Sequence, residues 1–178
     1  MKRKTAVPLD EAGLKEYALR LLAGRALTVA QLKEKLRRRA ADAASVERVV
    51  AQLKEYGALD DRRFAESFSS SRATSGQFGS RRVLAELARR KVASKVAEQA
   101  VRKAFQDLDE DQLVRAWLER KYRNQDLGAL LGEPAKLAGV YRRLRHAGFS
   151  SGAAIRVLRR FSEQAEHLEG MEPDAPAE

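Results

Sequence analysis

The sequence contains no cysteine, which excludes disulfide bridges, thiolate nucleophiles and cysteine-ligated metal sites. Aromatic residues are scarce, at 6% of the 178 residues. No run of about 18 apolar residues occurs, so no membrane-spanning segment is predicted. The basic N-terminus is not followed by an apolar stretch of signal-peptide length, and we expect a soluble, cytoplasmic protein.

Catalytic motifs are missing as well. The chain has no Gly-rich phosphate loop, no nucleophile elbow and no HExxH pattern, and we expect neither enzymatic activity nor a cofactor. His146 and His167 are the two histidines, and their wide separation argues against a metal site. Asp60 and Asp61 form a carboxylate pair, but a position at a helix start explains them as capping residues.

Alanine, leucine and arginine dominate the sequence, and all three favour helices because they lose little side-chain entropy there. No segment shows the strict alternation of a half-buried strand. The sequence therefore predicts an all-α protein. Apolar periodicity, caps and breakers place nine helices, at about 10–24, 28–40, 43–56, 61–74, 80–91, 94–106, 110–123, 135–147 and 151–164.

Apolar positions recur at offsets of 51 and 108 residues, which indicates three copies of one three-helix unit. The aligned columns are Leu32/Val83/Val140, Leu36/Leu87/Leu144, Val46/Ala97/Ala154, Val49/Ala100/Val157 and Val50/Val101/Leu158. A unit of about 50 residues has a small core and is marginal alone, so neighbouring units should pack together. We expect an elongated array of three tandem repeats.

The repeat boundaries follow from this alignment. We expect a basic arm at 1–9, the first repeat at 10–60, the second at 61–108 and the third at 109–162. A Gly- and Pro-containing loop at 124–134 should lengthen the third repeat. The acidic, proline-containing segment 163–178 should be a disordered tail, either a solubilising end or an electrostatic shield over the basic body.

The charge is unevenly distributed. The net charge is +10, with +16 on residues 1–161 and −6 on residues 162–178. Arginine outnumbers lysine by 24 to 11, which suits bidentate binding of phosphate and carboxylate. Such a basic body points to nucleic acid or an acidic protein surface as a partner, with a merely solvated surface as the alternative explanation of the charge.

The strongest local motif joins the first two repeats. It runs from Gly57 through Asp60 and Asp61 into an aromatic–alanine helix ending at Arg72, and it resumes with a glycine, two arginines and a Glu-Leu pair at 79–87. Here the sequence resembles the RecX family, and segments near 18–36 and 140–150 extend the resemblance to about residues 12–161. Departures are Gln31, where the family usually has glutamate, the enlarged 124–134 loop and the acidic tail.

The resemblance implies a small cytoplasmic regulator of tandem three-helix repeats that binds the RecA–DNA filament. Such proteins typically inhibit the recombinase, ATPase and co-protease activities of RecA by blocking filament extension or promoting disassembly. We therefore expect a monomer whose partners are the RecA filament and single- or double-stranded DNA bound without sequence preference.

Basic clusters near the second helix of each repeat are the candidate filament- or DNA-binding residues. We expect them to form one positive stripe, with Arg81 and Arg82 most exposed at a helix N-terminus, where cations oppose the helix dipole. A solvated helix face is the alternative for any single arginine. The clusters are Lys35, Arg37, Arg38 and Arg39; Arg81, Arg82, Arg89, Arg90 and Lys91; and Arg142, Arg143 and Arg145.

Other readings remain open. Trp117 lies on an apolar helix face and is expected in the core, whereas Tyr122 and Tyr141 fit either core packing or stacking on nucleic acid. The main alternative function is a basic helical regulator acting directly on DNA, with helix-turn-helix-like units. A protein–protein adaptor that binds without DNA is a further possibility.

Overall fold

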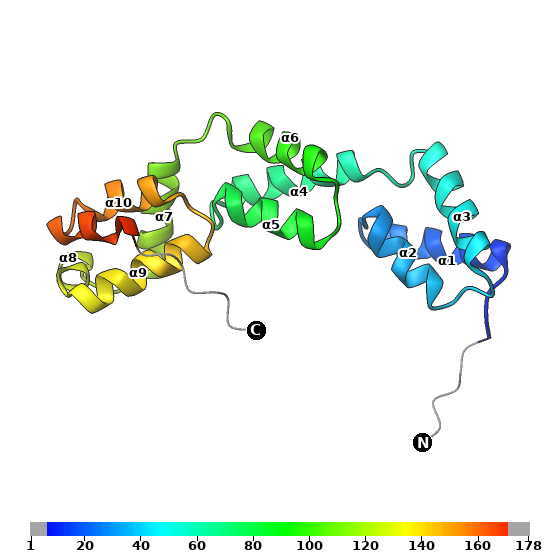
Figure 1. Ribbon diagram of the computed structural model, residues 1–178, viewed down its shortest axis with the longest axis horizontal. Helices are drawn as coiled ribbons and strands as arrows, with labels where there is room; N and C mark the ends of the chain where they lie inside the picture. The colour runs from blue at the N-terminus through cyan, green and yellow to red at the C-terminus, as the bar shows by residue number, and fades with distance from the viewer. Residues whose placement is uncertain (1–6, 171–178) are drawn as a thin grey trace, which may run out of the picture. The chain divides into compact units, whose positions relative to one another are not determined.

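The computed structural model describes residues 7–170, with side chains through Leu168. It divides into two compact units, one formed by residues up to 67 with 87–97, the other by 68–86 with residues from 98 onward. The described residues form helices and no strand, apart from one parallel bridge between Leu9 and Ala40. The fold is all-α, as predicted (Figure 1).

All nine predicted helices are present. They are α1 (Glu11–Gly24), α2 (Val29–Arg37), α3 (Ala43–Glu55), α4 (Asp61–Ser75), α5 (Ser80–Arg89), α6 (Ser94–Phe105), α7 (Glu110–Lys121), α9 (Pro134–His146) and α10 (Ser151–Leu158). Two further elements, α8 (Leu127–Gly132) and the 3-10 helix η1 (Glu163–Gly170), were not predicted.

Local side-chain chemistry sets the helix starts. The Asp10 carboxylate accepts a hydrogen bond from Gly13 N at 2.9 Å and caps α1. Thr28 and Gln31 form a reciprocal capping box at the start of α2. Gln31 therefore supplies the acceptor that a glutamate would supply, because only a side-chain carbonyl oxygen is needed there.

The threefold repeat is confirmed by burial. All fifteen side chains of the five aligned columns are buried, from Leu32, Val83 and Val140 in the first column to Val50, Val101 and Leu158 in the last. The spacing therefore identifies equivalent inward positions in three tandem three-helix repeats. The elongated stacking of the repeats stays a prediction.

In the first unit, α1, α2 and α3 bury one apolar cluster. Leu14 and Ala18 of α1 contribute to it, as do the aligned residues of α2 and α3, and Leu59 closes the cluster beyond Gly57. Gly57 adopts φ +66°, a left-handed conformation that ends α3 and that other residues seldom adopt.

In the second unit, the core of the third repeat joins α7, α9 and α10. Val114 and Leu118 of α7 pack with the aligned residues of α9 and α10. Leu131 of α8 and Leu168 of η1 are also buried in this cluster. The third repeat is therefore larger than the first because two extra elements add apolar side chains to its core.

These two elements correct two predictions. The predicted loop at 124–134 contains α8, because Asp126 caps it by accepting from Gly128 N at 2.8 Å and Leu131 is buried. The predicted disordered tail was wrong for residues 163–170, where Ala165 and Leu168 supply enough apolar contact to hold η1. Residues 171–178 lie outside the described part of the chain.

An ion pair between the first and third helices recurs in two repeats. Arg48 Nε lies 2.7 Å from Glu11 Oε2, and Arg156 Nη2 lies 2.7 Å from Asp111 Oδ1. Arg48 and Arg156 are separated by the repeat offset of 108, so the contact itself is a repeated feature. It ties the start of the first helix to the third helix in each of these repeats.

The second repeat uses the carboxylate at the start of its first helix differently. Gln99 stands at the position of Arg48 and Arg156, so no arginine is available there. Asp61, which begins α4 much as Asp111 lies in the first turn of α7, instead accepts a hydrogen bond from Val29 N at the start of α2, at 2.8 Å. The repeat that has glutamine in place of this arginine thus uses its carboxylate to contact the preceding repeat.

Candidate partner-binding surface

Five of the twelve predicted cationic residues, Lys35 among them, lie in the last turns of the second helices. Arg37 is in the last turn of α2, Arg89 in that of α5, and Arg143 and Arg145 in that of α9. Cations there interact favourably with the negative end of the helix dipole. Helix stability alone therefore explains their recurrence, and their positions do not by themselves indicate a partner.

In the first repeat, three of the four predicted cations have partners within the chain. Arg37 Nη2 lies 3.4 Å from Glu47 Oε1, Arg38 pairs with Glu34, and the Arg39 guanidinium lies 5.4 Å from the centre of the Tyr17 ring. Lys35 is half-buried and has no ion pair among the described residues. The exposed pairs contribute little to stability, so these cations remain available for exchange with another anion.

Arg82 has a structural role. Its Nη1 donates to the His146 carbonyl at 3.2 Å, its Nε lies 3.5 Å from Glu86 Oε1, and its guanidinium stacks 5.6 Å from the Phe78 ring centre. Glu86 is mostly buried and also binds Arg72 at 3.2 Å. These contacts hold the α4–α5 loop against the end of α9.

Arg81 is different from its neighbour. It is exposed, and its side chain has no hydrogen bond or ion pair within residues 7–170. It lies in the first turn of α5, where a cation opposes the helix dipole. Contacts within the protein therefore account for the position of Arg81 less well than for that of any other predicted cation.

The N-terminus of α5 is closed by the third repeat. Gly79 N donates to the Ala147 carbonyl at 2.9 Å, and Arg81 N donates to the Gly148 carbonyl at 3.3 Å. Backbone carbonyls of the α9–α10 turn thus occupy the positions where an anion would bind. An anion bound by Arg81 must be held by its side chain and not by the helix N-terminus.

The cations of the third repeat are mostly engaged. Arg143 Nη1 donates to the Tyr122 hydroxyl at 2.9 Å, and Arg145 Nη1 donates to the Phe149 carbonyl at 2.7 Å. Arg142 is half-buried and has no charged partner in the described part of the chain. Of this cluster, Arg142 is the best candidate for an outside contact.

One predicted cationic residue at the α5–α6 turn contacts the start of α2 through its backbone. The Arg90 carbonyl accepts from the Thr28 hydroxyl at 2.8 Å. Lys91 is exposed and adopts φ +57°, an uncommon conformation for a residue other than glycine. Arg89 is exposed, and like Lys91 it has no ion pair within the described ranges.

The repeat alignment groups several of the predicted cations in shared columns but leaves Arg81 and Arg142 outside them. At the offsets that align the buried residues, Arg38, Arg89 and His146 fall in one column, and all three are exposed. Arg81 aligns with Ala30, and Arg142 with Glu34. A continuous positive stripe would therefore have to combine side chains from different helix positions, and the stripe stays a prediction.

The aromatic residues of the third repeat form core contacts. Tyr122 and Tyr141 are buried, which excludes stacking of either ring on nucleic acid in this conformation. Trp117 packs against the same core, with its ring centre 6.3 Å from that of Tyr122 and 6.5 Å from that of Phe149, both edge to face. The core assignment of Trp117 is confirmed.

Three carboxylates have lowered pKa values. The hydrogen bond from Arg156 lowers the pKa of Asp111, that from Lys33 lowers the pKa of Glu47, and those from Ser45 lower the pKa of Asp42. All three carboxylates therefore lose their charge at a lower pH than an ordinary carboxyl group of the same type. Each belongs to an ion pair or helix cap, which is a structural environment and not a catalytic one.

The described residues contain no cluster of three histidine or acidic side chains that could hold a metal ion. Within residues 7–170, no helix combines the length and apolar character needed to cross a bilayer.

The chain matches known family models and curated relatives. Residues 15–53 match the model of the first three-helix domain of RecX, and residues 60–101 match that of the second. The regulatory protein RecX of Mycobacterium sp. (strain JLS) is 34% identical over 154 residues, covering 85% of this chain and 82% of the relative. The chain belongs to the RecX family. The regulatory protein RecX of Halorhodospira halophila is 37% identical over 151 residues, with 80% and 88% of the two chains covered.

Solved RecX structures have the same fold. A crystal structure of regulatory protein RecX matches with a TM-score of 0.69 and 20% identity, over 83% of this chain and 72% of the other. RecX from Lactobacillus salivarius matches with a TM-score of 0.67 and 17% identity, over 86% and 97%. The second RecX domain match includes α5, so Arg81 and Arg82 lie on a helix that belongs to the family fold.

The sequence did not reveal the contact between the second and third repeats. It depends on Gly79 and Gly148, whose close approach lets Gly79 N donate to the Ala147 carbonyl at 2.9 Å. The glycines were visible as helix breakers, but nothing in their spacing indicates that they meet.

Proposed function

We propose that this RecX-family protein binds the RecA–DNA filament and inhibits its ATPase, recombinase and co-protease activities. Membership in a family of regulatory proteins is the observation that carries the proposal. The basic body supports it, because a filament presents DNA phosphates. In this proposal the protein acts as a cytoplasmic monomer without catalytic chemistry of its own.

Arg81 is the proposed first contact with the filament, with Arg142 a second. Arg81 is exposed, unpaired within residues 7–170 and unfavourably placed for the helix dipole, so an external anion would improve its electrostatic environment. Arg82 is not proposed as a contact, since its guanidinium is used by Glu86 and the His146 carbonyl. If Arg81 and Arg82 were both replaced by glutamate, a loss of binding could not be distinguished from a loss of folding.

The test is a titration of this protein into RecA hydrolysing ATP on single-stranded DNA. Inhibition far below one molecule per RecA subunit would indicate binding at filament ends, and inhibition only near equal amounts would indicate binding along the groove. Arg81→Glu should weaken inhibition by at least about tenfold, the order expected for reversing one contact at an anionic interface. Arg102→Glu is the matched control, because Arg102 is also exposed and the charge change is the same.

A second candidate function is direct action on DNA. The net charge of +10 favours it, because phosphate contacts alone give appreciable affinity. Binding to bare DNA that is as strong as binding to RecA-coated DNA would favour this alternative. A steep fall in affinity with salt would indicate phosphate contacts, and a footprint on one duplex sequence would indicate base readout.

A further inference from the structure

The chain from the end of α6 to the first turn of α7 is acidic, whereas the body as a whole is basic. Residues 105–113 contain four carboxylates and no cation, in a chain whose net charge is +10. Two of the carboxylates, Asp107 and Asp109, flank Leu108. Leu108 is 40% exposed, which makes it one of the few large apolar side chains at the surface of the described residues.

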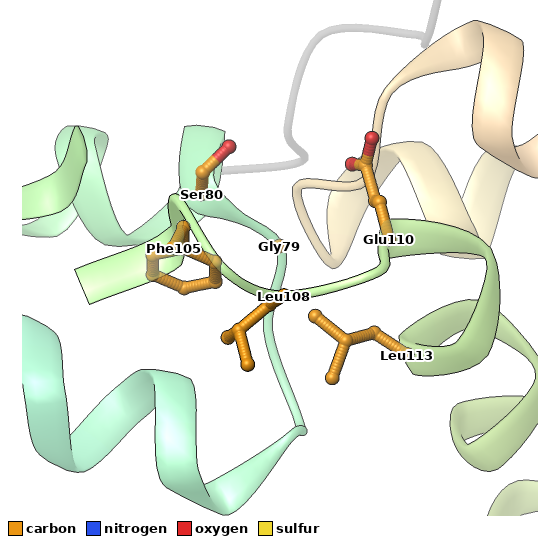
Figure 2. A pocket seen from close by; sticks show the side chains of 6 residues that line it. All are labelled: Gly79, Ser80, Phe105, Leu108, Glu110 and Leu113. Carbon is orange, nitrogen blue, oxygen red and sulfur yellow. The ribbon is translucent and has the colours of Figure 1, made fainter. Parts of the chain in front are cut away.

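A pocket of about 180 Å³ lies at this segment, within the second unit. Figure 2 shows Leu108 and Leu113 approaching one another, with Phe105 beside Leu108. The Ser80 hydroxyl and the Glu110 carboxylate point to the other side, and Gly79 completes the lining. A cavity of about 150 Å³ can hold a benzene ring, so this pocket has room for one large apolar side chain.

Most of the nearby carboxylates are used within the fold. Glu110 accepts from the Ser150 hydroxyl at 2.6 Å and from its backbone N–H, while Asp111 pairs with Arg156. Asp109 caps α7 by accepting from the backbone N–H of Asp111 at 2.9 Å. Asp107 accepts from the Gln106 side-chain amide at 3.2 Å and has no cationic partner in the described part of the chain.

This arrangement selects between possible occupants. Asp111 is neutralised by Arg156, but Asp107, Asp109 and Glu110 have no ion-pair partner among the described residues and repel a phosphate backbone, so DNA is disfavoured at this surface. A protein segment with a large apolar side chain next to a lysine or arginine is complementary, because the apolar group can enter the pocket while its neighbour meets Asp107. The basic surfaces elsewhere remain available for DNA.

We infer that the pocket between Leu108 and Leu113 docks an apolar side chain flanked by basic residues from the protein component of the filament. The inference rests on the proposed function, and it separates the contact with RecA subunits from the contact with DNA. Leu108 and Asp107 are its two determinants, one for the apolar side chain and one for the basic neighbour.

The experiment measures binding of the full chain to RecA-coated single-stranded DNA and, separately, to bare single-stranded DNA, by fluorescence anisotropy. The variants are Leu108→Ser and Asp107→Lys, and the control is Leu19→Ser, which removes a similarly exposed apolar side chain from α1. Each test variant should weaken binding to the coated DNA at least about tenfold, the loss typical of a central interface residue. Neither should weaken binding to bare DNA.

The outcomes are distinct. Wild-type protein that does not bind RecA-coated DNA would overturn the proposed function itself. Wild-type binding that both test variants retain would overturn the docking site alone. An equal loss of affinity for coated and for bare DNA would also overturn it, since the pocket would then not be a contact with the RecA protein. A loss confined to coated DNA, with Leu19→Ser unaffected, supports it.

Discussion

Gly79 and Gly148 meet backbone to backbone: a Cβ atom on Gly79 would lie 2.2 Å from the Gly148 carbonyl oxygen. A Cβ atom on Gly148 would lie 2.3 Å from Arg82 N. Both clashes involve main-chain atoms, which cannot rotate away as a side chain can. This contact places the start of α5 directly on the α9–α10 turn.

Alanine at either glycine should therefore destabilise the protein. We expect Gly79→Ala to cost about 2–3 kcal/mol, because the backbones must separate and lose the hydrogen bond between Gly79 N and the Ala147 carbonyl. Gly148→Ala should cost at least as much, since Gly148 also adopts φ +92°. Urea unfolding followed by circular dichroism measures both. Gly24→Ala is the control, because a Cβ there meets nothing within 4 Å, and a comparable loss in it would contradict the explanation.

Glu86→Gln should destabilise the second unit by about 1–2 kcal/mol, since it removes the charge that Arg72 and Arg82 share. The Glu86 side chain is only 13% exposed, so water cannot replace it fully. The thermal midpoint of unfolding is the measurement. Glu34→Gln breaks the exposed pair with Arg38 and should change stability by less than about 0.5 kcal/mol.

The Asp111–Arg156 pair should make stability depend on pH. Its arginine lowers the pKa of Asp111 from the ordinary value of 3.8, so the folded state binds fewer protons than the unfolded chain. The contribution is complete above the unfolded pKa and is lost as the pH falls through the folded pKa.

Asp111→Asn should accordingly be less stable than the parent at neutral pH, and this difference should shrink as the pH falls below about 4. Urea unfolding across this pH range tests the prediction. Asp107→Asn, at a carboxylate with no cationic partner among the described residues, should leave stability nearly unchanged. A difference between parent and Asp111→Asn that stays constant with pH would rule out the ion pair as its source.

Thr28→Ala should destabilise the first repeat by about 1–2 kcal/mol. The hydroxyl accepts from Gln31 N and donates to the Arg90 carbonyl, so one substitution removes both a helix cap and a contact with the α5–α6 turn. Thr28→Ser keeps the oxygen and should retain most of the stability. Thr74→Ala, on the exposed face of α4, serves as the control and should be neutral in thermal unfolding.

Much of the fold was predictable because it depends on local chemistry. Leu32, Leu36 and their counterparts at the repeat offsets lie inside because helical periodicity puts them on one face. Caps such as Asp10 and Thr28 act over three residues, so their effect is visible in the sequence. The same reasoning missed η1, since two apolar residues in an acidic segment show no sustained period.

The candidate surface was predicted less well. Arg81 and Arg82 are adjacent and look equivalent in the sequence, yet Arg82 is bound to Glu86 and the His146 carbonyl while Arg81 is exposed. Composition and repeat spacing by themselves determined the helical class and the threefold unit, and the motif at 57–72 and 79–87 carried the family resemblance. Only the tertiary structure decided which cations are engaged and that Gly79 meets Gly148, because those contacts join residues far apart in the chain, whose approach depends on how whole helices pack.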